Sequence, residues 1–201
     1  MSDLTLIGSA GDQQIDATLL AIVRAFEQAF PTRVRAYYLI GSYVERTAVP
    51  LSDIDCFVIF ASQFATPQEE SLAEQVGQQC ALSSPVRLDL GAYPESAVDQ
   101  LYPVLRVALK LGSQLVYGVD IRQAIALPAF PEYTASLVAG AEHFIARIRG
   151  ETDLAARPVG YPDTSDEFFG YTRKSIPAWY PPAIAAGTKE LVAAVSRIAA
   201  A

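Results

Sequence analysis

Two aspartates one residue apart, Asp53 and Asp55, are the side chains whose type and spacing best suit chemistry. They open an apolar run, and positions i and i+2 of a strand point to the same face, about 6–7 Å apart along the chain. A third acid, Asp89, lies inside another apolar run, Val-Arg-Leu-Asp-Leu. Hard divalent cations take oxygen ligands, so these carboxylates favour a metal site.

A glycine-serine turn, Gly41-Ser42, ends the apolar run that precedes the paired acids. A helix that begins there would offer free N–H groups, and glycine lets a phosphate approach the backbone closely. Converging carboxylates can hold two divalent ions about 4 Å apart, which clamp the attacking and leaving oxygens of a phosphoryl transfer. The turn and the acids together indicate chemistry on a phosphate.

Alternation and capping signals predict the elements that must position these residues. Apolar residues recur at helical spacing before Pro31, and Thr66-Pro67 followed by two acids is typical of a helix start. In chain order we expect helix 12–30, strand 34–40, a short helix 42–47, a central strand 53–61, helix 67–81, strand 86–93, helix 96–111 with a break or new first turn at Pro103, and a short edge strand 115–118.

Composition limits the class of protein. The 201 residues suit one large domain or two small ones, and half of them are hydrophobic. A formal charge of −7 argues against a nucleic-acid surface. Cys56 and Cys80 are expected to be free thiols of a reducing cytoplasm, and no apolar run is long enough to span a bilayer. We expect a cytoplasmic protein with neither a nucleic-acid nor a membrane partner.

The chain resembles the nucleotidyltransferase superfamily, whose members share the DNA polymerase beta catalytic fold. The resemblance rests on Gly-Ser-x10-Asp-x-Asp followed by Asp89 in an apolar strand, and it covers residues 34–92 well. It is weaker over 111–120, and beyond that the chain is similar to aminoglycoside nucleotidyltransferases in order and composition. It implies an α+β fold with a mixed sheet flanked by helices over 1–127, and a small helical domain over 128–201. The last predicted helix reaches Ala201, so we expect that this domain is incomplete.

The resemblance implies a role for each residue of the motif. Gly41 and Ser42 would bind the triphosphate of a nucleotide, and Asp53 and Asp55 would ligate Mg²⁺. Asp89 would complete the metal site or act as the base that takes a proton from the acceptor hydroxyl.

One departure from the family pattern concerns the loop after the turn. Many relatives carry an arginine where this chain has Glu45, and Arg46 follows one place later. Arg46 is therefore a candidate phosphate ligand, and Lys189 in the helical part is another. The alternatives that involve no catalysis or binding are a simple turn at Gly41-Ser42, solvated acids at the strand start, and Asp89 in a structural ion pair with Arg87 or Arg46.

The function that we expect is transfer of a nucleoside monophosphate, AMP from ATP with Mg²⁺, to a hydroxyl of a small molecule. An aminoglycoside-like antibiotic is the leading acceptor by analogy, which would make the chain a resistance enzyme. Two alternatives stay open: an antitoxin-type enzyme that adenylylates a protein partner, and a non-catalytic nucleotide-binding module. The acceptor, the preferred nucleotide and the formation of a homodimer are not fixed by the sequence.

Overall fold

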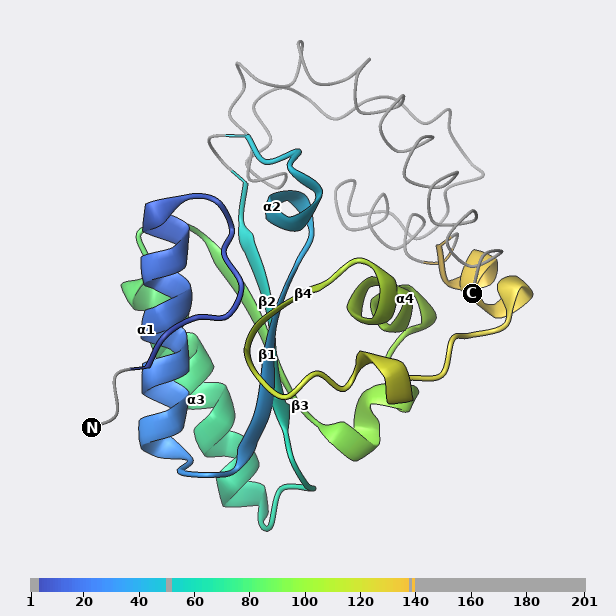
Figure 1. Cartoon of the computed structure of the whole chain (residues 1–201). Helices are drawn as coiled ribbons and strands as arrows, with labels where there is room; N and C mark the ends of the chain where they lie inside the picture. Colours follow the sequence, from blue (N-terminus) through green and yellow to red (C-terminus); the bar gives the residue numbers. More distant parts are fainter. Residues whose placement is uncertain (1–3, 50–51, 138, 140–201) are drawn as a thin grey trace, which may run out of the picture. The chain divides into compact units, whose positions relative to one another are not determined.

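A mixed sheet organises the part of the chain that the computed structural model describes, residues 4–49, 52–137 and 139 (Figure 1). Its four strands lie in the order β3-β2-β1-β4. β1 runs antiparallel to both β2 and β4, and β2 runs parallel to β3. The strands are β1 (Val34–Ile40), β2 (Ile54–Phe60), β3 (Leu88–Pro94) and β4 (Gln114–Gly118). The expected α+β fold with a mixed sheet is confirmed.

The two longest helices begin where capping side chains accept hydrogen bonds from free N–H groups. Asp12 Oδ1 accepts from the N–H of Gln14 at 2.8 Å, and Thr66 Oγ1 accepts from the N–H of Glu69 at 3.1 Å. The helical elements are α1 (Gln13–Ala29), α2 (Ser42–Glu45), α3 (Pro67–Ser83), α4 (Pro103–Leu111) and the 3-10 turns η1 (Glu95–Gln100) and η2 (Arg122–Ala124). The predicted helix 96–111 is therefore two elements, because the ring of Pro103 fits a first helical turn and not a helix interior.

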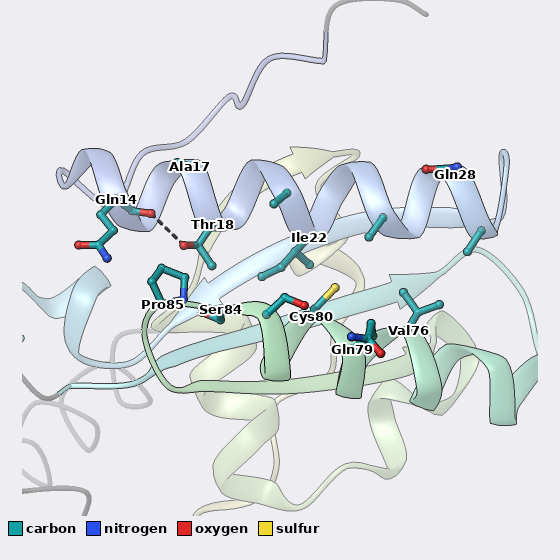
Figure 2. A pocket seen from close by; sticks show the side chains of 14 residues that line it. Gln14, Ala17, Thr18, Ile22, Gln28, Val76, Gln79, Cys80, Ser84 and Pro85 are labelled. Carbon is teal, nitrogen blue, oxygen red and sulfur yellow. Dashed lines mark hydrogen bonds between the residues drawn. The ribbon is translucent and has the colours of Figure 1, made fainter.

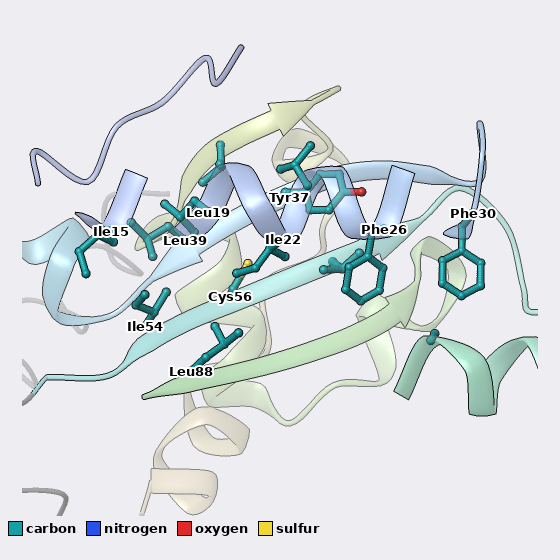
Figure 3. Packing of buried hydrophobic residues seen from close by; sticks show 14 of the residues in the cluster. Ile15, Leu19, Ile22, Phe26, Phe30, Tyr37, Leu39, Ile54, Cys56 and Leu88 are labelled. Atoms are coloured by element: carbon teal, nitrogen blue, oxygen red, sulfur yellow. The ribbon is translucent and has the colours of Figure 1, made fainter. Parts of the chain in front are cut away.

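The core on one face of the sheet lies beneath α1 and α3 (Figures 1 and 3). β2 contributes every second residue to it, as the two-residue period of a strand requires. Each large apolar side chain that is fully buried stabilises the fold by about 1.5–3 kcal/mol. The buried members of this core are Ile15, Leu19, Ile22, Val23, Phe26, Phe30, Tyr37, Leu39, Ile54, Cys56, Val58, Phe60, Ala73, Leu88 and Val116.

The opposite face of the sheet has a smaller core in which β1 and β2 meet the segments after β3. Phe57 and Ile59 of β2 pack there with Tyr38 and Leu109. The hydroxyl of Tyr38 donates to Asp120 Oδ1 at 3.0 Å and accepts from the N–H of Ile121 at 2.7 Å. This bond pair fastens the segment after β4 to the centre of β1.

The described residues fall into two compact units. Leu105–Ala126 joins the residues up to Leu101 in the first unit, and Leu127 begins the main part of the second. Residues 130–137 are helical. Most of the segment 128–201 lies outside the described residues, so its assignment to a helical domain stays a prediction. None of the helices in the described ranges is long and apolar enough to cross a membrane.

Candidate active site

The sheet register brings the acids of the motif to one edge of the two parallel strands. Asp53 directly precedes β2, Asp55 is its second residue, and Asp89 is the second residue of β3. In the parallel pairing Asp55 lies opposite Asp89, and paired strands are about 4.8 Å apart. Residues far apart in the sequence therefore place three carboxylates on adjacent strand starts.

Asp55 is the most perturbed of these acids. Burial, together with the negative charges of Asp53 and Asp89, raises its pKa to about 7, and Arg87 acts in the opposite direction. Desolvation and like charges both disfavour the ionised carboxylate, so the site is under electrostatic strain when no cation is bound. A raised carboxyl pKa beside further acids is typical of a functional site that binds a cation.

The Gly41-Ser42 turn, called the phosphate turn here because it is predicted to bind a phosphate, lies against the same carboxylate. Gly41 has φ +75°, and a Cβ placed there would collide with Asp55 Oδ2. The backbone of the turn therefore passes directly over the acid, which only glycine allows. The predicted helix 42–47 is shorter than expected, because α2 ends at Glu45 and Arg46 turns left-handed at φ 58°. So short a helix has a small dipole, and the N–H groups of Ser42 and Tyr43 are the donors that a phosphate would meet.

Two arginines, Arg46 and Arg87, were the candidate ion-pair partners of the acids. The Nε of Arg87 is 3.9 Å from Asp53 Oδ2, and both side chains are largely exposed. The structural ion pair considered for Asp89 is thus made to Asp53 instead, and it is too long and too exposed to matter much for stability. Arg46 is exposed and, within the described residues, forms no ion pair with the acids.

The three carboxylates are donors of the type that a divalent cation prefers, although they do not converge on one point. Within the described ranges, no three His, Cys, Asp or Glu side chains converge closely enough to hold one ion. The fit rests instead on the chemistry: hard oxygen donors, a half-buried carboxylate without a cationic partner of its own, and two acids beside it. Lys189, the other predicted phosphate ligand, lies outside the described residues.

Sequence reasoning overlooked the support of the loop that leads into the acids. Ser52 is buried, and its Oγ accepts from the N–H of Val49 at 2.9 Å. The hydroxyl of Tyr43 lies 3.5 Å from the carbonyl oxygen of Ser52, and its pKa is raised by burial and by the charges of Asp12 and Asp53. Two sequence signals could have predicted this support: Ser52 directly precedes the acid pair, and Tyr43 directly follows the Gly41-Ser42 turn.

A pocket that does not include the acids lies elsewhere in the first unit. It is a groove of about 820 Å³ between α1 and α3, and Figure 2 shows side chains such as Ile22, Val76 and Cys80 along it. All of its lining residues are uncharged, and it contains neither the acids nor the phosphate turn. It has no group that would bind a triphosphate, so the chemistry belongs to the strand starts.

Comparison with known proteins agrees with this assignment of the fold. Residues 19–109 match the family model of the nucleotidyltransferase domain, a segment that includes the phosphate turn and all three acids. No curated protein sequence matches the chain significantly. Among solved structures, the chain is similar to spectinomycin adenyltransferase AAD(9) from Enterococcus faecialis with ATP and spectinomycin, at 16% identity and a TM-score of 0.53 over 66% of this chain and 68% of that one.

Two further structural matches are toxin-antitoxin assemblies. One is a toxin-antitoxin with AMP-PNP, at 16% identity and a TM-score of 0.40, covering 69% of this chain and 94% of that one. The other holds tri-AMPylated Shewanella oneidensis HEPN toxin in complex with MNT antitoxin, at 16% identity, a TM-score of 0.38 and the same coverage. At such identities a likeness speaks for the fold alone. The family match, the sheet and the acids agree in assigning residues 19–109 to the nucleotidyltransferase domain.

Proposed function

We propose that this chain transfers AMP from ATP to a hydroxyl group of a small molecule, with Mg²⁺ as the metal. The observation that carries the proposal is the register of the two parallel strands, which sets Asp55 opposite Asp89 with Asp53 beside them. The phosphate turn then lies against Asp55 through Gly41.

Each residue of the chain takes a defined part in this reaction. Asp53 and Asp55 hold the metal, which when bound supplies the positive charge that neutralises the phosphates. The N–H groups after Gly41 bind the triphosphate, and Asp89 completes the metal site or accepts the proton of the acceptor hydroxyl. Arg46 and Lys189 are proposed as additional phosphate ligands. Catalysis is then mostly positioning and charge neutralisation, with little covalent chemistry by the protein.

The small-molecule acceptor is supported by the structural neighbour with the higher TM-score. That neighbour was solved with ATP and spectinomycin, a pairing of nucleotide and small antibiotic. The formal charge of −7 of this chain also favours a cationic small acceptor over a polyanion. We therefore propose an amine-bearing, hydroxylated acceptor of the antibiotic type.

An acceptor screen tests the proposal directly. The full chain is incubated with Mg²⁺, ATP labelled at the α-phosphate and a panel of hydroxylated amines that includes spectinomycin. We expect pyrophosphate release together with label on one member of the panel, and neither signal from the Asp53→Asn/Asp55→Asn variant. Label on a protein instead of a small molecule would refute the acceptor class, and ATP binding without turnover against any acceptor would refute the enzyme.

A further inference from the structure

The two edge strands of the sheet differ in how their outer backbone groups are paired. On β4, the N–H of Ile7 donates to the carbonyl of Val116 at 2.9 Å, and Gln114 Nε2 donates to the carbonyl of Ser9 at 3.0 Å. The chain's own N-terminal segment thus lies along this edge. On β3, the described residues include no strand or segment that pairs with the outer side.

The ladder between β2 and β3 determines which backbone groups of β3 face outward. The N–H of Ile54 donates to the carbonyl of Arg87 at 2.8 Å, and Ile54 is paired with Leu88. In a parallel ladder the paired residue then turns its own N–H and C=O away from the neighbour, and every second residue repeats this. Leu88, Leu90 and Ala92 therefore present unpaired donors and acceptors at the edge.

This edge lacks several of the features by which natural edge strands avoid added partners. Edges are usually protected by lysine, proline, a β-bulge or very short length. β3 pairs with β2 without a register shift from Leu88 to Pro94, it contains no lysine, and its proline is its last residue. By contrast, β4 is both covered and bulged against β1. The open edge is thus a local property of β3.

A groove of about 530 Å³ runs beside the open edge, between β3 and α3. Small residues one helical turn apart, Ala73, Gly77 and Ala81, form its α3 side. Glu74 and Asp89 supply its only charges, because no lysine or arginine lines it. The groove therefore offers shape, free backbone groups and negative charge at one place.

We propose that the outer edge of β3 binds an extended, basic polypeptide segment of a partner protein as an added strand. Main-chain hydrogen bonds to Leu88, Leu90 and Ala92 would give the affinity. Lysine or arginine side chains on the α3 side of the added strand would lie near Glu74, and one on its opposite side would lie near Asp89. Charge complementarity selects a basic partner over an acidic one. The docked strand would end beside Asp89. The proposal goes beyond nucleotidyl transfer and does not depend on which acceptor is used.

Binding of short synthetic peptides tests the proposal on the full chain. A labelled peptide of alternating lysine and valine is titrated in a fluorescence anisotropy assay against a peptide of alternating glutamate and valine. We expect the basic peptide to bind at least about tenfold more tightly, with an advantage that falls as salt is added. Amide hydrogen exchange at Leu90 and Ala92 should slow when the basic peptide is bound.

Two variants and a matched control locate the contact. Ala92→Pro removes one outward N–H without touching the ladder to β2, and Glu74→Lys reverses a charge at an exposed helical position. Each should weaken the basic peptide by roughly fivefold or more. Gln79→Lys places a lysine on the α1 side of the same helix, where it lines the other groove, and should leave affinity nearly unchanged.

Several outcomes would overturn the proposal. Equal affinity for both peptides would remove the charge argument, and unchanged amide exchange at Leu90 and Ala92 would remove the strand argument. Exchange that slows with protein concentration and without peptide would mean that the edge pairs with a second copy of this chain. Because Glu74→Lys is a surface substitution, the test stands even if Ala92→Pro does not fold. Nucleotidyl transfer is measured separately, so its failure would leave this result intact.

Discussion

The two faces of β2 differ in the side chains that one continuous strand presents to them. Toward α1 and α3 the strand shows Ile54, Cys56 and Val58, which are almost completely buried. Toward the other face it shows Phe57 and Ile59, but its first residue on that side is Asp55. Adjacent residues of a strand thus serve packing on one side and an ionisable site on the other.

The difference indicates that stability and chemistry can be altered separately in this domain. On the apolar face every atom gains from burial, whereas Asp55 loses hydration and is repelled by its neighbours. The face of β2 that carries Asp55, the acid face, therefore destabilises the folded protein when no ligand is bound. Burial of the side chains on the apolar face offsets this loss of stability. The following changes, ordered by expected effect, separate the two faces.

The largest effect is expected from Asp53→Asn combined with Asp55→Asn. Because both proposed metal ligands lose their charge while keeping their shape, nucleotidyl transfer should fall on the order of 10³-fold or more. The free energy of unfolding without metal should stay equal or rise, because the repulsion is relieved. Melting curves with and without Mg²⁺ and ATP measure this. The metal site would be contradicted if the variant had a lower melting temperature than the parent and Mg²⁺ did not change the melting temperature of the parent.

Phe26→Ala, on the apolar face, should lower stability and leave activity intact, the reverse of the effect expected for the acids. Phe26 is fully buried and contacts the rings of Phe30, Tyr37 and Phe60. Its truncation should cost about 3–5 kcal/mol of unfolding free energy in a denaturant titration. Activity per folded molecule should be retained. The control Leu82→Ala, at a side chain that is 82% exposed, should cost less than about 0.5 kcal/mol.

Gly41→Ala tests whether the turn and the acid face act together. The added methyl group would meet Asp55 at a backbone φ that disfavours alanine, so ATP affinity with Mg²⁺ should fall by roughly tenfold. Gly11→Ala is the matched control, because its φ is +78° and nothing lies within 4 Å of the new methyl. Calorimetric titration with ATP should show no change for Gly11→Ala. Equal losses in both variants would mean that backbone strain alone explains the effect.

The smallest effect concerns pH. The pKa of Asp55 is about 7 in the folded protein, above its value in an unfolded chain, so the folded state keeps the proton longer. Stability from this group is complete at acidic pH and is lost as pH rises through about 7. The loss should be on the order of 1 kcal/mol, allowing for partial solvent screening. Asp55→Asn should flatten this part of the profile, and a parent whose stability rises between pH 5 and 8 would contradict the assignment.

Much of the fold could be predicted because local signals and tertiary packing agree. The first helix has a capping Asp12 and an apolar period that ends at Pro31, and it forms over Gln13–Ala29. The strand 34–40 was predicted at its observed bounds. The start of β3 was placed two residues early, because the apolar pattern begins at Val86 whereas the paired residues begin at Leu88. Nothing local marks where pairing with a distant strand begins.

The site was predictable in its residues more than in its geometry. Spacing of the acids and the position of Gly41 come from the strand and turn periods, and these are local. The contact of Arg87 with Asp53 and the open edge of β3 depend on which strands become neighbours. Pairing order is a property of the whole sheet, so no short stretch of sequence contains it.

The Tyr38 hydroxyl has a consequence for the order in which the chain folds. Its bonds to Asp120 and to the Ile121 N–H span 82 and 83 residues, whereas the much shorter segment 41–53, which contains α2, connects β1 to β2. Closing a long loop costs more chain entropy and is slow, so the β1–β2 hairpin should form well before β4 arrives. During synthesis on a ribosome, the far side of β1 therefore stays open until the segment around residue 121 has emerged. Mutations at Asp120 should consequently speed unfolding more than they slow folding, because that contact forms after the rate-limiting step.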